Sequence, residues 1–213
     1  MRESTIEMPL QLAVHTLSGI TGALARDGYA IVPNFLDNTT CAALAAEGQR
    51  QIDAGLLKMA GVGQGEEHSL RREIRSDHIL WLDDGNSAPL QRQYLALLEA
   101  YRQEVNRQLF IGLFEFEGHL ALYPPGSFYK RHLDRFRDDD RRTVTAILYL
   151  NDDWKEENGG QLRFYPNGEK SSEYIDVLPE AGTFVTFLSH NYWHEVMPGN
   201  RERMSLTGWF KRR

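Results

Sequence analysis

In the first half of the chain, apolar residues recur every three or four positions, which is the period of a helix that buries one face. This spacing predicts three helices, over residues 8–25, 41–52 and 88–109. The run Asp37-Asn38-Thr39-Thr40 offers side-chain oxygens that can cap the second helix, and Ser87 offers one for the third. We therefore expect the first half of the chain to be largely helical.

A glycine-rich segment separates the second and third helices. Residues 61–67 contain three glycines and show no hydrophobic period, which predicts a loop. Strands are predicted before it over 29–35 and after it, first through Ile74 and then over 79–82. The loop is either part of a surface hairpin or a lid that grips the substrate, because long glycine-rich loops often carry function.

From Gly118 onward, short apolar runs alternate with turns rich in glycine, proline and asparagine. Eight strands are predicted, over residues 119–123, 128–133, 143–151, 161–165, 172–177, 183–188, 194–197 and 203–210. Strands this short and this evenly spaced predict a mainly β fold, a double-stranded β-helix or jelly roll. Because the helices come first, we expect one domain over residues 1–213, with a helical support over about 8–110 and the jelly-roll core over about 118–210.

Composition sets limits on this picture. The chain of 213 residues is 41% hydrophobic and 25% charged, which excludes a disordered chain, collagen and a coiled coil. The net charge of −6 gives no general electrostatic reason to bind nucleic acid. Cys41 is the single cysteine, so no intrachain disulfide can form, and a reducing compartment is favoured. With neither a secretory signal nor a membrane-spanning segment in the sequence, we expect a cytoplasmic protein without a membrane partner.

Two histidines and an aspartate form the strongest candidate site among the seven histidines of the chain. His132 and Asp134 are two residues apart at the end of a predicted strand, so their side chains can point to the same face. His194 opens another short strand, and together the three match the facial triad of non-haem iron oxygenases. A catalytic zinc site uses the same ligand types. A simple His132–Asp134 pair with an interior His194 is the structural alternative.

The last predicted strand favours iron. Its alternate residues form a polar face with one aromatic side chain, made of Arg203, Ser205, Thr207 and Trp209. An arginine inside a barrel needs an anion, and its planar fork matches a carboxylate. An open iron site beside a buried arginine suits 2-oxoglutarate, whose 2-oxo acid end chelates the metal while its distal carboxylate meets Arg203. A surface ion pair of Arg203, or a competing role for Arg201, is the alternative.

Several motifs then occur in order: Gly28-Tyr29-Ala30-Ile31-Val32, Ile74-Arg75-Ser76-Asp77, Tyr123-Pro124-Pro125-Gly126, Tyr129-Lys130-Arg131-His132-Leu133-Asp134, Tyr149-Leu150-Asn151-Asp152-Asp153-Trp154, Gly159-Gly160-Gln161-Leu162-Arg163 and His194-Glu195-Val196. On these motifs the chain resembles the prolyl hydroxylase domain family of 2-oxoglutarate- and Fe(II)-dependent oxygenases. That family includes the oxygen-sensing hydroxylases of hypoxia-inducible factor, and the likeness is to a bacterial member. The resemblance runs from about Leu17 to Phe210.

The resemblance implies roles for individual residues. It assigns Fe(II) to His132, Asp134 and His194. It assigns the distal carboxylate of 2-oxoglutarate to Arg203 and the Tyr149 hydroxyl, in a pocket lined by Tyr123, Leu162, Thr207 and Trp209. It makes Arg75 and Asp77 part of a mobile substrate loop, with Arg142 as the partner of Asp77. The implied cofactors are Fe(II), with 2-oxoglutarate and O2 as cosubstrates and ascorbate as an optional reductant.

The implied reaction is 4-hydroxylation of a prolyl residue in a protein. Asn191-Tyr192-Trp193 before His194 differs from the animal oxygen sensors, which favours a translation component such as elongation factor Tu over a hypoxia factor. Two other functions stay open at this point. The chain could oxidise a free amino acid or another small molecule, or it could be a sensory jelly roll that holds iron and 2-oxoglutarate without turnover.

Overall fold

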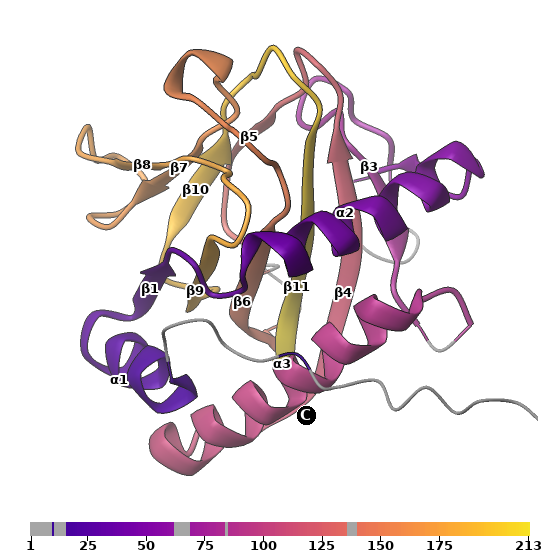
Figure 1. Cartoon of the computed structure of the whole chain (residues 1–213). Helices are drawn as coiled ribbons and strands as arrows, with labels where there is room; N and C mark the ends of the chain where they lie inside the picture. The colour runs from indigo at the N-terminus through magenta and orange to yellow at the C-terminus, as the bar shows by residue number, and fades with distance from the viewer. Residues whose placement is uncertain (1–9, 11–15, 62–68, 84, 136–139) are drawn as a thin grey trace, which may run out of the picture.

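The computed structural model describes residues 10, 16–61, 69–83, 85–135 and 140–213. Within them the strands form two antiparallel sheets that share a core, and three helices cover the other face of the larger sheet (Figure 1). The predicted fold class, a mainly β jelly roll supported by N-terminal helices, is confirmed.

The larger sheet has the strand order β1-β9-β6-β11-β4-β3-β2. Its strands are β1 (Tyr29–Val32), β2 (Lys58–Met59), β3 (His78–Trp81), β4 (Leu113–Tyr123), β6 (Arg142–Tyr149), β9 (Phe184–Leu188) and β11 (Arg203–Arg212). The smaller sheet has the order β5-β10-β7-β8. Its strands are β5 (Tyr129–His132), β7 (Leu162–Tyr165), β8 (Ile175–Val177) and β10 (Trp193–Val196).

The helices are α1 (Leu17–Asp27), α2 (Asn38–Asp53) and α3 (Pro89–Leu109), and a 3-10 turn, η2 (Glu156–Asn158), lies in the strand-rich half. Asp37 caps α2 as predicted, because its carboxylate accepts a hydrogen bond from the amide of Thr40. Figure 1 shows α2 and α3 lying across the central strands of the larger sheet. None of the helices in the described part of the chain is long and apolar enough to cross a membrane.

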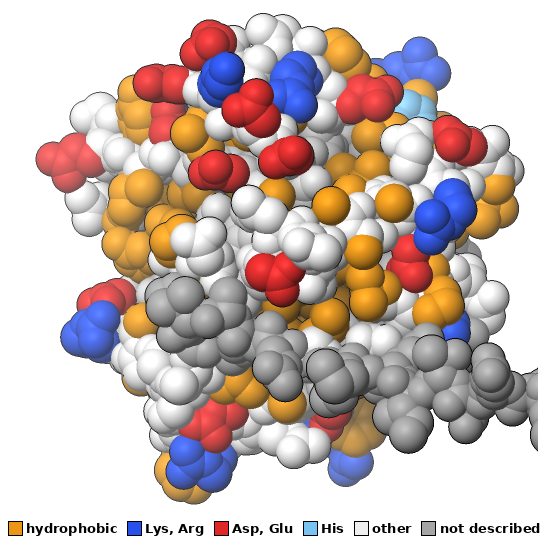
Figure 2. Space-filling view, in the orientation of Figure 1, with side chains coloured by type: hydrophobic (Ala, Val, Ile, Leu, Met, Phe, Trp, Pro, Cys, Tyr) orange, Lys and Arg blue, Asp and Glu red, His pale blue; other side chains and the backbone are white. Residues whose placement is uncertain are grey.

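The larger sheet separates two apolar cores. Alternate residues of β6, such as Leu148, pack with the helices, whereas the residues between them, such as Ile147, pack with the smaller sheet. The same alternation divides β11, where Leu206 and Phe210 belong to the helical core. Because both faces of these strands are buried, the register of each strand decides which side chains enter the space between the sheets. On the opposite, helical face, Figure 2 shows acidic and basic side chains interspersed.

The first helix starts later than the sequence predicts. Thr16 has an extended backbone and its hydroxyl accepts a hydrogen bond from the amide of Gly19, so the helix begins at Leu17 rather than at residue 8. Leu10 is not helical, and residues 8, 9 and 11–15 lie outside the described part of the chain. Thr16 therefore caps a helix that starts within the predicted range rather than at its beginning.

The region around the glycine-rich loop also differs from the prediction. Ile74 lies in a turn, and the short strand that pairs with β3 is β2, which precedes the loop. Residues 62–68, where the lid was predicted, lie outside the described residues. Arg75 forms an isolated bridge to Tyr129 of β5, so the chain after the loop is anchored to the smaller sheet.

The start of α3 is capped from another helix. Ser87 was predicted to cap it, but the N-cap residue is Ala88, which has no capping side chain. Instead the buried carboxylate of Glu47, in α2, accepts hydrogen bonds from the amides of Leu90 and Gln91 at 3.0–3.1 Å. A negative charge at this position also interacts favourably with the helix dipole.

Replacing this cap should destabilise the protein. We expect Glu47→Ala to lower the free energy of unfolding by about 1–2 kcal/mol, because it leaves two buried amides unpaired. Glu47→Gln keeps an accepting oxygen and should lower the free energy of unfolding by less than Glu47→Ala does. Glu99→Ala, which removes an exposed ion pair with Arg102 and an exposed hydrogen bond from Gln103, should cost less than about 1 kcal/mol. Urea denaturation checks these values, and equal losses for Glu47→Ala and Glu99→Ala would contradict the capping role.

Candidate metal centre and cosubstrate pocket

Three predicted ligands meet at one end of the smaller sheet. His132 ends β5, and it is directly paired with His194 of β10. Paired residues in an antiparallel ladder project to the same face, so the register alone brings the two imidazoles together. Asp134 follows β5, and its carboxylate oxygens lie 3.5 Å from Nε2 of His132 and 3.5 Å from Nε2 of His194. The three ligand atoms all lie within 4.8 Å of one another, a spacing that fits a single metal ion.

Main-chain carbonyls orient both imidazoles. Nδ1 of His132 lies 2.7 Å from the carbonyl oxygen of Lys130, and Nδ1 of His194 lies 3.0 Å from that of Tyr192. A carbonyl oxygen only accepts, so each Nδ1 carries the proton and donates it. When both rings are neutral, the lone pair of each Nε2 atom then points toward Asp134. A histidine needs such a free lone pair to bind a metal ion.

Asp134 is prepared to act as an anionic ligand. Its side chain is buried, and Thr145 on β6 donates a hydrogen bond to its Oδ2 at 2.8 Å. The hydroxyl of Ser189 lies 2.9 Å from that of Thr145 and extends the network. Burial alone would raise the pKa of Asp134, but the two neighbouring histidines hold that pKa well below its usual value. The carboxylate is therefore charged at neutral pH.

Arg203 is buried near this triad without an acidic partner. It is 4% exposed, its guanidinium lies 4.9 Å from the ring centre of Tyr123 and 4.8 Å from that of Tyr149, and no ion pair joins it to a described carboxylate. Its Nε and the Tyr149 hydroxyl have no hydrogen-bond partner among the described residues. Burial raises the pKa of Tyr149, and the positive charge of Arg203 opposes that rise. A buried cation beside an unpaired hydroxyl fits a ligand carboxylate.

The predicted pocket residues largely share one cavity. It is lined by all three triad residues, by Arg203, and by Tyr123, Leu162, Thr207 and Trp209. Tyr149 borders Arg203 from β6 but does not line this cavity. Ser205 also lines it, so the polar face predicted for the last strand does point inward.

The glycine pair before β7 makes room for Arg203. Gly160 has a left-handed backbone (φ 69°), and a Cβ atom there would lie 3.4 Å from Cδ of Arg203 and 3.0 Å from the ring of Trp154. At Gly159 (φ 68°) a Cβ would lie 2.4 Å from the carbonyl oxygen of Pro198. Both positions therefore require glycine, because the turn lies directly against the arginine and the β10–β11 connection.

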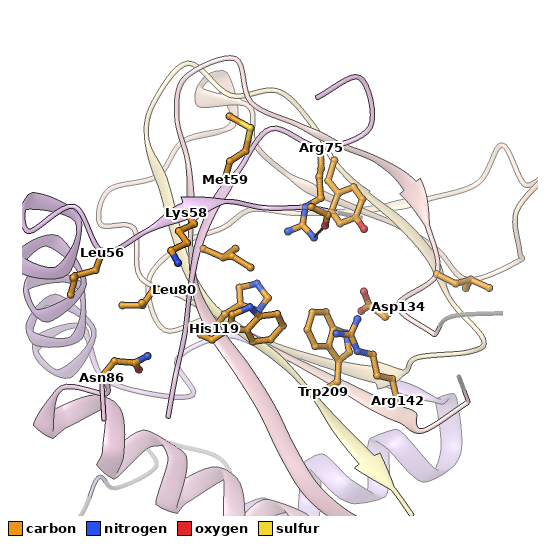
Figure 3. A pocket seen from close by; sticks show the side chains of 15 residues that line it. Leu56, Lys58, Met59, Arg75, Leu80, Asn86, His119, Asp134, Arg142 and Trp209 are labelled. Carbon is orange, nitrogen blue, oxygen red and sulfur yellow. Dashed lines mark hydrogen bonds between the residues drawn. The ribbon is translucent and has the colours of Figure 1, made fainter. Parts of the chain in front are cut away.

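The loop residues pair differently from the prediction. Asp77 is fully buried and is held by Arg75, with Nε–Oδ1 and Nη2–Oδ2 distances of 2.8 and 2.5 Å. Arg142 instead donates to Glu117 at 2.7 Å and lies over the ring of Trp209 at 3.4 Å. Arg75 donates to both carboxylate oxygens of Asp77, so an Arg75–Asp77 pair stands in place of the predicted Arg142–Asp77 pair. Arg75 and Arg142 both line a second, wider cavity next to the triad (Figure 3).

Sequence reasoning missed three neighbours of the site. Tyr129 stacks on the imidazole of His132 at 3.6 Å, Thr145 bonds Asp134, and His119 lines both cavities. Strand alternation could have indicated them, since Tyr123 is four residues beyond His119 on the same face of β4, and Tyr149 is likewise four beyond Thr145 on β6. The Tyr129–His132 stack lies within β5, whereas the contacts of Thr145 and His119 join different elements and were not visible in the sequence.

A jelly roll that holds two histidines and a carboxylate beside a cavity, with a buried arginine in the same cavity, defines a class of protein. It is the class of non-haem iron oxygenases that take a 2-oxo acid as cosubstrate. Comparison with known proteins agrees with this class. A family model of the 2OG-Fe(II) oxygenase superfamily matches residues 118–211.

Solved structures and curated relatives narrow the class. The structure of a Pseudomonas putida prolyl-4-hydroxylase is 47% identical, with a TM-score of 0.82, covering 93% of this chain and 100% of that one. A Trichoplax adhaerens prolyl hydroxylase, solved with a peptide of hypoxia-inducible factor, is 26% identical with a TM-score of 0.79, covering 92% and 89%. The hypoxia-inducible factor prolyl hydroxylase of Caenorhabditis elegans is 33% identical over 86% of this chain.

The chain belongs to the prolyl hydroxylase family of 2OG-Fe(II) oxygenases. It spans 26% of the length of the Caenorhabditis elegans relative and about half of the mammalian Egl nine homolog 1 proteins that it also matches.

The hydrogen bond from Thr145 should tune metal binding. We expect Thr145→Val to weaken Mn(II) binding about 10- to 100-fold, because Asp134 loses the donor that orients its carboxylate. Thr186→Val is the matched control, since it removes a buried hydroxyl that contacts Tyr101 away from the site. Anaerobic titration with Mn(II) measures both affinities. Unchanged Mn(II) affinity in Thr145→Val would show that the hydrogen bond does not matter for the metal.

Proposed function

We propose that this chain is a peptidyl-prolyl 4-hydroxylase that uses Fe(II), 2-oxoglutarate and O2. The observation that carries the proposal is the convergence, in one cavity, of the His132–Asp134–His194 triad with the buried, unpaired Arg203. The similarity to a bacterial prolyl-4-hydroxylase over its whole length supports proline as the target.

In this proposal, His132 and His194 would bind iron through Nε2, and Asp134 would bind it through a carboxylate oxygen. Three protein ligands on one side leave the other coordination positions for the cosubstrates. Bound iron would supply the oxidative chemistry that converts 2-oxoglutarate and O2 to succinate and CO2 and adds an oxygen atom to C4 of the prolyl ring. The Lys130 and Tyr192 carbonyls and the Thr145 hydroxyl keep the ligands oriented.

The same cavity suits 2-oxoglutarate at its other end. Arg203 would hold the distal carboxylate with its guanidinium, and the unpaired Tyr149 hydroxyl would donate to it. Apolar side chains of the cavity, including Ile147, Leu162 and Val196, exclude water from this ion pair. Exclusion of water strengthens the attraction between guanidinium and carboxylate.

The substrate in this proposal is a polypeptide in the cytoplasm. Support comes from the Trichoplax relative, which was solved with a bound peptide. The similarity to a bacterial enzyme favours a translation component, with elongation factor Tu as the first candidate. The net charge of −6 is consistent with a protein rather than a nucleic acid as partner.

The arginine assignment can be tested by binding alone. We expect Arg203→Ala to weaken 2-oxoglutarate binding to the Mn(II)-loaded protein by at least about 30-fold, because the ligand carboxylate loses a buried charged partner. Arg201→Ala is the matched control, since Arg201 is exposed and donates only to the carbonyls of Asp152 and Asp153 and to Asn158. Anaerobic calorimetry gives both constants. Equal affinities for the two variants would refute the assignment.

The activity is tested on intact proteins. Purified elongation factor Tu and, separately, a bacterial lysate are incubated with Fe(II), 2-oxoglutarate and O2, and tryptic peptides are analysed by mass spectrometry. We expect a proline that gains one oxygen atom, and no such product from Asp134→Ala or with a metal chelator. Oxidation of lysate proteins but not elongation factor Tu would leave the reaction intact and reject this substrate. No hydroxyproline on any protein would reject the prolyl hydroxylase function.

A further inference from the structure

One buried histidine near the site has no role in the chemistry proposed above. His119 lies on β4, is 3% exposed, and is not a member of the metal triad. It lines the cavity that contains the triad and also the adjacent groove, which has a volume of about 440 Å³. Figure 3 shows the His119 ring between β3 and Trp209, facing the space that Arg75 and Asp134 border. The imidazole therefore stands where the two cavities meet.

Strand register places His119 in a row of side chains. It is directly paired with Trp81 on β3 and with Thr207 on β11. The Trp81 ring meets the imidazole edge-on, with centroids 5.1 Å apart, and the centroid of the Trp209 ring lies 5.4 Å from that of the imidazole. The two indole rings also contact each other, with centroids 6.3 Å apart, so the three rings form a triangle. Trp81 is 44% exposed, whereas Trp209 is buried. An aromatic cluster that includes one imidazole thus reaches from the surface to the iron cavity.

Two polar atoms of this cluster are unsatisfied. Nδ1 of His119 and Nε1 of Trp209 are buried and have no hydrogen-bond partner among the described residues. A buried polar atom without a partner is unfavourable, and it calls for an explanation such as a missing ligand or water. Both residues face the same two cavities, so the same ligand can meet both.

The imidazole is neutral. Burial, followed by the positive charges of Arg75 and Arg142, lowers the pKa of His119 to about 3, against a smaller opposing effect of Asp77 and Asp134. A neutral imidazole has one N–H and one lone pair, and either tautomer can be selected by a partner. It can therefore serve either a carbonyl oxygen or an amide hydrogen of a neutral ligand.

We propose that His119 is a substrate-positioning residue whose Nδ1 hydrogen-bonds to the main chain of an extended, proline-containing segment lying in the groove. The inference rests on the prolyl hydroxylase function proposed above and deepens it. A segment that extends from the groove into the iron cavity passes the residues that line both spaces, which are Arg75, His119, Tyr129, Asp134 and Trp209. Aromatic clusters suit prolyl rings and extended proline-rich segments. A peptide main chain that passes such a cluster needs hydrogen-bond partners, and His119 provides one.

The test uses substitutions that separate the two ring nitrogens. His119→Leu removes both, His119→Asn places an amide near the position of Nδ1, and His119→Gln places one near Nε2. The matched control is His78→Leu on β3. Nδ1 of His78 is also buried and unpartnered, but His78 lines neither cavity.

The probe is selected from short peptides that each carry one central proline. The library is panned against the wild-type chain loaded with Mn(II) and 2-oxoglutarate without O2, and the Kd of the strongest binder is measured by fluorescence anisotropy. We expect His119→Leu and His119→Gln to weaken peptide binding about tenfold, which corresponds to about 1.4 kcal/mol. His119→Asn should stay within about threefold of wild type. 2-Oxoglutarate affinity should be the same in all variants.

Three results would overturn any role of His119 in peptide binding, and a fourth would overturn the assignment of Nδ1. The three are wild-type peptide affinity in His119→Leu, equal weakening by His119→Leu and His78→Leu, and selection of no prolyl peptide at all. Equal loss in the Asn and Gln variants would also reject Nδ1 as the contact and indicate a structural role. These failures are distinct from failure of the proposed function, which is decided by hydroxyproline formation on intact proteins. If the wild-type chain forms hydroxyproline but the His119→Leu variant binds peptide normally, only this inference is rejected.

Discussion

The register of β11 is the constraint on which the rest of the structure depends. This strand lies between β4 and β6 and is buried on both faces, so each of its residues must belong either to the helical core or to the space between the sheets. Leu206 and Phe210 face the helices, while Arg203 and Thr207 face the cavity. A slip of one residue would exchange the two sets and place a guanidinium in the apolar helical core. The fold and the site are therefore specified by the same alternation.

The metal centre depends on a second register, that of the smaller sheet. Pairing of His132 with His194 places two imidazoles on one face, and main-chain carbonyls direct their Nε2 atoms toward Asp134. Thr145 then links that carboxylate to β6 of the larger sheet. The ligands are thus oriented by backbone groups and by a neighbouring strand, which keeps the site assembled on rigid elements.

Unsatisfied polar groups concentrate around this site. Tyr149 and Arg203 lack partners at the cosubstrate end, and His119 and Trp209 lack them at the groove. Buried atoms of Thr21, His78, Ser87 and Tyr94, which line neither cavity, also lack partners among the described residues. The carboxylates of Glu47 and Asp77, by contrast, are engaged by other residues. A folded protein tolerates unpaired buried atoms mainly where a ligand will complete them. The two groups of unpaired atoms at the site correspond to the two ligands that we propose. Tyr149 and Arg203 would bind a dicarboxylate, and His119 would bind a peptide main chain.

The sequence by itself determined the jelly roll, the triad and the inward face of β11. The inward face of β11 rests on the two-residue period of strands, which relates residues such as Arg203 and Ser205 through local geometry alone. Asp134 lies just beyond the end of β5, so its closeness to His132 follows from sequence proximity rather than from strand alternation. Only the tertiary structure decided the start of α1, the capping of α3 by Glu47, the pairing of Asp77 with Arg75 and the position of His119. The cap from Glu47 and the surroundings of His119 join segments whose relative placement no local period encodes, whereas Arg75 and Asp77 are two residues apart and form a local pair. At the start of α1, a capping threonine lies within an otherwise helical pattern. Asp77 shows the limit most clearly: its two nearby arginines were both visible in the sequence, but only packing determined which one reached it.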